Sequence, residues 1–431
     1  MSESVAPAPP FLRGLNGLRF FAALFVVVGH THENLLLYGF GPPLHPLGLT
    51  PVGMSLFFVL SGFVIHLTYG QDFSGGVRLR NTAAFLGKRF ARLAPLLLFG
   101  LVMNLSDWHE WGRFFGQPDF RAFVATYLLA MPSWMPYWLD GKLQINAFFG
   151  ISWAIYTELF FYGAYPLLVP LILRLRRPGL VVAAALGLSA AALLLLHGLY
   201  AHGPALELAY REFAGPQVVI AGRDQANSVL RWAAYVAPYT RIFEFLLGAL
   251  AAQLYLRLAD RPPAPAETRR AAAVLYAALG LLLCLYVLLI AGRLPPFMHF
   301  LHMNFLFAGP IAAAVFCVAR YRSAVALFLS SGPLVFLGEI SYSLYINHSV
   351  TTHAFHWRGQ AWEAYPSVPF GMAFLVILSI GTYRLIELPA RRRLNAAFAR
   401  LLDQPGGAAA MLSAIAAAIA LGFWIALANF A

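Results

Sequence analysis

The sequence predicts an all-α fold, a polytopic bundle of transmembrane helices. Of its 431 residues, 60% are hydrophobic and 11% are charged, and the mean hydropathy is +0.69. A soluble globular domain carries about 25% charged residues. Apolar windows of roughly 17 to 25 residues, the length of a helix that crosses a bilayer, recur along the whole chain. Composition and window length therefore both predict that the protein lies in a lipid bilayer, which is one of its partners.

Eleven windows are predicted to form spanning helices. They lie near residues 15–33, 51–69, 90–106, 146–173, 179–198, 235–256, 271–291, 303–319, 334–354, 367–387 and 408–429. The first window is expected to be retained, because the residues before it lack the basic start and the small-residue cleavage site of a secretory signal.

The positions of Lys and Arg predict the orientation. They cluster between alternate windows, for example at 78–92 and 391–393, and such clusters mark the cytoplasmic side. The N-terminus is therefore expected in the cytoplasm and, after eleven crossings, the C-terminus outside. These short clusters account for the net charge of +12, so we expect no nucleic-acid partner. Rich usage of Ala, Leu and Arg suggests a bacterial protein, and hence the cytoplasmic (inner) membrane.

Two longer segments, 107–146 and 202–229, are expected on the outer side. The apolar stretch 120–131 would place Arg174 to Arg177 outside if it crossed, so we predict that it only dips into the interface. Loops carry much of the binding specificity of proteins. We therefore expect these two segments to select a substrate.

The first window carries a polar stripe. A helix turns about 100° per residue, so Arg19 and His30 lie on one face, which Glu33 extends. Ionisable groups in hydrocarbon are costly and usually face an interior pathway. The alternative is that Arg19 only extends to the interface and that a neighbouring helix caps His30.

Charged groups also mark the third and fourth windows. Arg89 and Arg92 are neighbours on a helix surface, and guanidinium groups suit phosphate oxygens; ordinary positive-inside charge is the alternative. Glu158 is a carboxylate among aromatic residues. It is expected either to form a structural ion pair, for which Arg241 is a candidate, or to hydrogen-bond an acceptor or His30.

The ninth window places Ser341, Tyr345 and His348 on one helix face, where they are expected to line a cavity. The two cysteines, Cys284 and Cys317, show no metal-ligand spacing, and the twelve histidines form no closed set of three or four ligands. We therefore expect no metal and no permanently bound cofactor.

Six ordered blocks of the sequence resemble the acyltransferase 3 family of integral membrane acyltransferases. The blocks are Leu15 to Arg19 with Gly29-His30, then Gly53 to Phe63, Lys88 to Pro95, Ser152 to Tyr162, Gly338 to His348 and Glu387 to Arg392. Asn16 stands where the family usually has aspartate, and Asn347 stands where it usually has tryptophan. Each block alone is a weak match, but six in the right order make a strong one.

The resemblance implies a ten-helix acyltransferase core. We place that core at 15–393, between a cytoplasmic tail at 1–14 and a segment at 394–431 that adds a linker and one C-terminal transmembrane helix. In some relatives such a helix leads to an esterase-like domain, which for this chain is expected to be a separate protein.

The resemblance also implies an O-acyltransferase that moves an acyl group, expected to be acetyl, from cytoplasmic acyl-CoA to a hydroxyl of a carbohydrate or glycosylated acceptor. His30 would remove the hydroxyl proton or carry the acyl group itself, and Glu158 or Glu33 would orient it. The residues expected to hold the donor or to contact substrate are Arg19, Arg89, Arg92, Tyr345 and His348.

A membrane transporter of a glycolipid or a small solute is the alternative function. Buried charges and helix-breaking prolines would also serve a transporter, but no inverted repeat is visible in the sequence. Release of free CoA thiol would distinguish the enzyme from the carrier.

Overall fold

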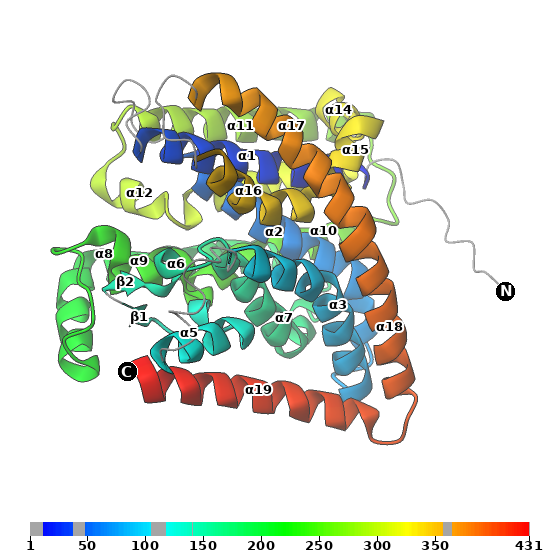
Figure 1. Ribbon diagram of the computed structural model, residues 1–431. Coiled ribbons are helices and arrows are strands. Elements are labelled where there is room, and N and C mark those ends of the chain that lie inside the picture. The colour runs from blue at the N-terminus through cyan, green and yellow to red at the C-terminus, as the bar shows by residue number, and fades with distance from the viewer. Residues whose placement is uncertain (1–11, 38–47, 105–117, 140, 357–363, 431) are drawn as a thin grey trace. The chain divides into compact units, whose positions relative to one another are not determined.

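The computed structural model describes residues 12–37, 48–104, 118–139, 141–356 and 364–430. Helices make up nearly all of it (Figure 1). The α-helices are α1 (Gly14–Leu37), α2 (Leu49–Tyr69), α3 (Leu79–Asn104), α5 (Pro118–Leu128), α6 (Gln144–Ala147), α7 (Ser152–Leu173), α8 (Pro178–Ala214), α9 (Val229–Arg231), α10 (Pro238–Leu258), α11 (Pro265–Ile290), α12 (Pro296–Leu301), α13 (Ala308–Arg320), α14 (Ala324–Leu329), α15 (Gly332–Glu339), α16 (Ser341–His356), α17 (Ala364–Thr382), α18 (Leu388–Leu402) and α19 (Gly407–Phe430).

Shorter elements connect these helices. The 3₁₀ turns are η1 (Gly70–Phe73), η2 (Met131–Ser133), η3 (Gln225–Asn227) and η5 (Phe305–Phe307), and the π-helical turns are η4 (Trp232–Val236) and η7 (Tyr383–Glu387). Two strands, β1 (Trp138–Leu139) and β2 (Lys142–Leu143), form an antiparallel hairpin in which Trp138 pairs with Leu143.

Proline marks where many of these helices begin. The first residues of five of them are Pro118, Pro178, Pro238, Pro265 and Pro296. Proline is favoured there because the N–H groups of the first helical turn have no partner within the helix, so its missing N–H is not needed. The sequence therefore sets these boundaries locally.

Seven helices of the described residues are long and apolar enough to cross a membrane. They are Gly14–Thr31, Leu49–Phe73, Ser152–Leu173, Pro178–Ala214, Pro265–Ile290, Pro369–Leu402 and Gly407–Asn429. Each overlaps a predicted window, so the prediction of an all-α, polytopic helix bundle is confirmed. The other four windows are also helical but are shorter, interrupted or more polar, and the count of eleven crossings stays a prediction.

Several boundaries differ from the predicted ones. The ninth window contains two helices, α15 and α16, which are separated at Ile340. Helix α8 continues to Ala214, so the first part of the predicted outer segment 202–229 is helical. In the other predicted outer segment, helix α5 has only 11 residues, fewer than the roughly 20 that a spanning helix needs.

The chain folds as two compact units. Unit 1 contains Met1–Thr68, Arg174–Ala190 and Phe243–Tyr345, and unit 2 contains Tyr69–Leu173, Ala191–Ile242 and Ile346–Ala431. Helices α8, α10 and α16 each contribute residues to both units. The predicted core at 15–393 therefore contains residues of both.

In unit 1, glycine brings α2 and α10 into backbone contact. A Cβ atom on Gly62 would collide with the carbonyl oxygen of Phe245, and one on Gly248 would collide with that of Val59. Small residues at a crossing let membrane helices approach closely. One face of each helix is thereby fixed against the other.

Helix α1 of unit 1 is held in the same way. A side chain on Gly17 would collide with the Leu329 carbonyl at the end of α14, and one on Gly338 of α15 would collide with the Asn16 carbonyl. On its other side α1 meets α2, where a Cβ on Gly53 would lie 2.7 Å from the Ala22 oxygen. Helix α1 therefore has little freedom to rotate or slide.

In unit 2, α18 packs along α3. Elements α17, η7 and α18 form one long helical run, drawn in orange and red-orange in Figure 1, and α19 follows in red. The Phe90 and Phe398 ring centroids are 6.2 Å apart, and Ala83, Leu402 and Met411 share a buried apolar cluster.

Candidate active site

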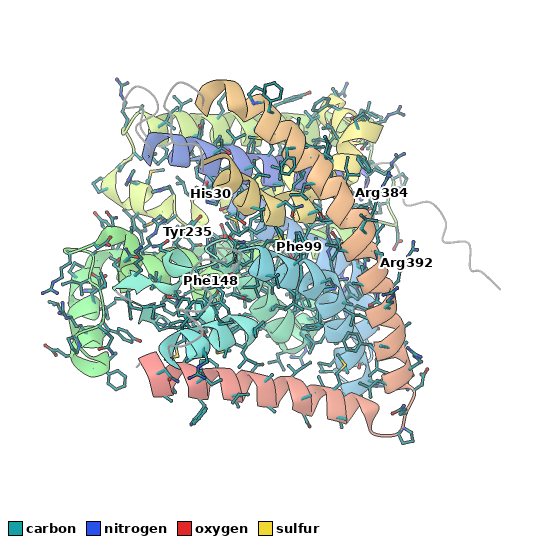
Figure 2. All side chains as sticks on the ribbon, in the orientation of Figure 1. His30, Phe99, Phe148, Tyr235, Arg384 and Arg392 are labelled. Atoms are coloured by element: carbon teal, nitrogen blue, oxygen red, sulfur yellow. The ribbon has the colours of Figure 1, made fainter. Side chains whose placement is uncertain are left out.

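Helix α1 carries two of the predicted site residues, Arg19 and His30. Figure 2 labels His30 on this helix. The Arg19 guanidinium donates to the Asn16 side-chain oxygen at 3.3 Å, so asparagine supplies an acceptor at the position where the family usually has aspartate. Beside His30, Gly29 leaves room for the Thr50 hydroxyl of α2. Glu33 lies on α1, but its side chain lies outside the described residues.

Helix α16 carries Tyr345 and His348, which are 5% and 1% exposed. The Tyr345 ring lies edge-on to Phe57 of α2, with the centroids 5.8 Å apart, within unit 1. His348 belongs to unit 2. Both lie in a helix as predicted, and the prediction that they line a cavity stays untested.

Unit 1 also contains a buried carboxylate that the sequence analysis did not assign to a site. Glu244 on α10 is fully buried, and the Ser55 hydroxyl of α2 donates to it at 2.5 Å. The same hydroxyl lies 3.1 Å from the carbonyl oxygen of Asn304. Arg241, one turn earlier in the same helix, donates from Nε to the Tyr235 carbonyl at 2.9 Å.

Arg89 lies on aromatic rings in unit 2. Its guanidinium carbon is 4.7 Å from the ring centroid of Tyr69 and 6.0 Å from that of Tyr162, and it donates to the Tyr69 hydroxyl at 2.5 Å. The residue is 8% exposed. Its Nε atom is buried and has no hydrogen-bond partner among the described residues. A buried donor without a partner is costly, so this atom is suited to receive a ligand.

A cluster of aromatic rings packs against Tyr69 and Tyr162, the two rings that contact Arg89. The Phe85 ring packs against Tyr69 at 5.2 Å, against Tyr165 at 5.5 Å and against Tyr162 at 6.1 Å between centroids. Phe73 of η1 closes the cluster against Phe85 and Tyr165. Rings packed edge to face lose little further entropy on binding and hold the guanidinium in place.

Glu158 and Arg92 join this cluster. Tyr162 lies close enough to Glu158, one helical turn earlier, and to Arg89 and Arg92 for all three to act on it electrostatically. The structure therefore brings together Arg89, Arg92 and Glu158, three of the predicted site residues, on α3 and α7. An ion pair between Glu158 and Arg241 stays a prediction.

The predicted site residues divide between the two units. Unit 1 contains Arg19, His30, Glu33 and Tyr345, and unit 2 contains Arg89, Arg92, Glu158 and His348. Within unit 1 the shared feature is helix α1, and within unit 2 it is the cluster around Arg89. Among the described residues, no group of three or more His, Cys, Asp or Glu side chains gathers in a geometry that could hold a metal ion.

The two predicted outer segments meet at Asn227 in unit 2. Its side-chain oxygen accepts from the Leu143 N–H and from the Asn146 amide, each at 2.9 Å, and its carbonyl accepts from the Trp138 indole at 2.7 Å. The Asn227 amide donates to Asp224 at 2.6 Å, and this hydrogen bond holds the pKa of the Asp224 carboxyl below its usual value. We call these contacts the Asn227 clasp.

Comparison with known protein families shows which family this chain belongs to. The profile of the acyltransferase 3 family, described as an acyltransferase domain, matches residues 12–384. The chain belongs to this family. The match includes helix α1 with Arg19 and His30, the Arg89 cluster and helix α16.

Curated relatives of this family come from several bacteria. The chain is 23% identical over 417 residues to the O-acetyltransferase OatA of Staphylococcus aureus, covering 93% of this chain and 60% of OatA. It is 26% identical over 357 residues to the putative peptidoglycan O-acetyltransferase YrhL of Bacillus subtilis, covering 78% and 48%. It is 29% identical over 181 residues to nodulation protein 10 of Rhizobium leguminosarum bv. viciae, covering 39% and 47%.

The chain thus spans about 60% or less of the length of these relatives. No solved structure matches it.

Sequence reasoning missed the aromatic residues that pack around Arg89. Tyr162 follows Glu158 by four residues, and this spacing alone could have indicated that the two side chains are neighbours on α7. Tyr69 is 20 residues from Arg89, in a different helix, and no local pattern joins them. Arg391 also lies near this cluster, and no local pattern joins it to Arg89.

Proposed function

We propose that this protein transfers an acetyl group from cytoplasmic acetyl-CoA to a hydroxyl group of a carbohydrate acceptor. It would act as a multi-pass protein of the bacterial inner membrane, with its N-terminus in the cytoplasm. Family membership supports acyl transfer, and the names of the relatives support acetyl as the group and an envelope carbohydrate as the acceptor class. The same membership favours an enzyme over a transporter.

The Arg89 cluster is the observation that carries the choice of donor. A guanidinium on two aromatic rings, with one N–H that has no partner in the described part of the chain and with Arg92 one turn away, matches the phosphate groups of a CoA thioester. An acetyl donor without phosphate would leave these positive charges uncompensated.

His30 is proposed as the base. As the acceptor oxygen attacks the thioester carbonyl, an imidazole nitrogen takes the hydroxyl proton, the carbon–sulfur bond breaks, and the proton passes to the departing CoA thiolate. In the alternative order, the imidazole is acetylated first and the acceptor then displaces it. Glu33 would orient the ring, and Arg19 would help to hold the donor.

Tyr345 and His348 are proposed to contact the substrate from α16. Both are almost fully buried, and the tyrosine hydroxyl and the imidazole are suitable partners for sugar hydroxyls. The Asn227 clasp would shape the acceptor side, because it joins the two segments that are expected to face outward.

Replacing His30 tests the proposal. Full-length protein in lipid nanodiscs is given acetyl-CoA and a soluble oligosaccharide acceptor, and free CoA thiol and acetylated product are both measured. We expect His30→Ala to abolish both signals, whereas His299→Ala, an exposed histidine of the same unit, keeps them. Full turnover in His30→Ala would reject the base, and a wild-type protein that releases no thiol with any carbohydrate acceptor would reject the enzyme.

A further inference from the structure

Helix α18 brings a third arginine to the donor cluster. The helix runs antiparallel to α3: Arg80 near the start of α3 pairs with Asp403 just after α18 at 2.8 Å, and Gly87, further along, faces the Phe398 ring. Continuing this register toward the start of α18 leads to Arg391, beside Arg89 and Arg92. Figure 2 labels the next residue, Arg392, on the same helix.

The charges around Arg391 confirm this placement. Arg391 is partly buried, and the charges of Arg92, Arg89 and Glu387 all act on it. Its neighbours Arg392 and Arg393 are exposed. One arginine of the three in this row therefore turns toward the cluster.

This arrangement concentrates positive charge. Arg89, Arg92, Arg391 and Lys88, whose ammonium is 5.8 Å from the Tyr69 ring centroid, supply four cations. Among the carboxylates, Glu158 acts on Tyr162, Asp72 acts on Tyr165 and Glu387 acts on Arg391. Like charges repel strongly where water is partly excluded, so the remaining excess of positive charge favours binding of an anion.

The geometry favours a polyphosphate over a carboxylate. One guanidinium fork can satisfy a carboxylate by itself. Three guanidinium groups on two helices, with a buried Nε of Arg89 that no other described residue hydrogen-bonds, offer more donors than a single carboxylate accepts. CoA carries a diphosphate and a further phosphate on its ribose.

We propose that Arg391 completes a three-guanidinium polyphosphate site with Arg89 and Arg92, and that this site binds the phosphate groups of the CoA donor. The inference rests on the proposed function. It assigns a role to a residue that lies beyond the segment matched by the family profile, residues 12–384. Anionic lipid headgroups carry the same chemistry, and the test separates the two sources.

The test compares two donors. Acetyl-CoA carries the phosphates, and acetyl-pantetheine has the same thioester without them. The KM and kcat for each donor are measured with full-length protein in nanodiscs of neutral lipid for wild type, Arg391→Ala and Arg391→Lys. The matched control is Arg393→Ala, which removes the same charge from an exposed position two residues away.

We expect Arg391→Ala to raise the KM for acetyl-CoA about tenfold, the effect of losing one charge-assisted hydrogen bond. Its kcat should stay unchanged, because this interaction is present equally in the ground state and the transition state. The KM for acetyl-pantetheine should not change. The KM of Arg391→Lys for acetyl-CoA should lie between those of wild type and Arg391→Ala, since this variant keeps the charge but loses the guanidinium fork. The KM of Arg393→Ala should match that of wild type.

Three results would overturn the inference. An equal KM increase for both donors would show a structural role, and an Arg391→Ala variant with the KM of Arg393→Ala would show no role. In a second set of nanodiscs that contain anionic lipid, an activity that depends on this lipid in wild type but not in Arg391→Ala, with an unchanged KM for acetyl-CoA, would assign the arginine to a lipid phosphate. If wild-type protein neither binds nor consumes acetyl-CoA, the proposed function itself is wrong, and this outcome is distinct from the other three.

Discussion

The two units pack their interiors with different chemistry. In unit 1 the helices meet through glycine, as at Gly62 and Gly248, where backbone touches backbone. In unit 2 aromatic rings pack between α3 and α7, and the Arg89 guanidinium lies on two aromatic rings.

The two kinds of packing suit different tasks: contacts at glycine fix the positions of helices, and aromatic rings support a side chain that can bind a ligand. Helices in backbone contact have little freedom to move, so unit 1 can hold the Arg19 and His30 positions of α1 rigidly. A long side chain on aromatic rings keeps its hydrogen-bond donors available and can adjust to a ligand. Substitutions in the unit 1 crossings should therefore affect folding, and substitutions of the unit 2 arginines should affect donor use.

The largest expected effect is that of Gly62→Ala in unit 1. The new methyl group collides with the Phe245 carbonyl, and separating two packed helices costs about 3 kcal/mol or more. We expect a large drop in thermal stability and in folded yield, measured by size-exclusion chromatography of heated detergent extracts. Gly280→Ala is the control, because open space surrounds Gly280 within α11 and alanine there gains about 1 kcal/mol of helix propensity. Equal losses in both variants would contradict the role of the crossing.

The next effect is that of Arg89→Ala in unit 2. We expect kcat/KM for acetyl-CoA to fall about 100-fold, corresponding to about 3 kcal/mol of lost charged hydrogen bonds, with only a small change in melting temperature. The control on the same helix is Arg80→Ala, whose ion pair with Asp403 is highly exposed and contributes at most about 1 kcal/mol. A large loss of stability with an unchanged donor KM would reverse the contrast between the units.

A smaller effect is expected for Ser55→Ala in unit 1. The change removes a hydrogen bond donated to the buried Glu244 carboxylate, which costs about 1.5 to 3 kcal/mol for a charged acceptor. The melting temperature should fall by several degrees. Ser189→Ala, which removes a bond to the Ala185 carbonyl in its own helix, should change stability by less than about 0.5 kcal/mol. No difference between the two serines would mean that Glu244 is satisfied without Ser55.

The smallest effect is the acid response of the Asn227 clasp in unit 2. Hydrogen bonding, first of all from Asn227, lowers the Asp224 pKa in the folded protein, so its contribution is present above the ordinary value of about 3.9 and is lost as the pH falls through the lower folded value. Hydrogen exchange of the Ala226 and Asn227 amides, which donate to Asp224, should quicken at low pH after correction for intrinsic rates. The Ala326 amide, which donates to the neutral Ser323 hydroxyl, should show no such change. Asp224→Asn should abolish the pH dependence.

The sequence predicted that α1 and α2 of unit 1 are helical, because the signals for these helices are local. The Gly17 and Arg19 positions, the helical start of α2 and the small residues near Gly62 all lie within short blocks that resemble the family. Their geometry follows from helical periodicity, which depends only on neighbouring residues. The same local reasoning failed at residue 340, because the break between α15 and α16 shows no proline or paired glycine.

By itself the sequence determined the helical class, the apolar segments, the family and the spacing of Arg89 and Arg92, since composition and short periodic patterns encode all four. Only the tertiary structure decided that Arg89 lies on Tyr69 and Tyr162, that Ser55 donates to Glu244, and that Arg391 lies near Arg89 and Arg92. These pairs come from different helices, and the packing that joins them depends on the shape and charge of surfaces far apart along the chain. No window of neighbouring residues contains that information.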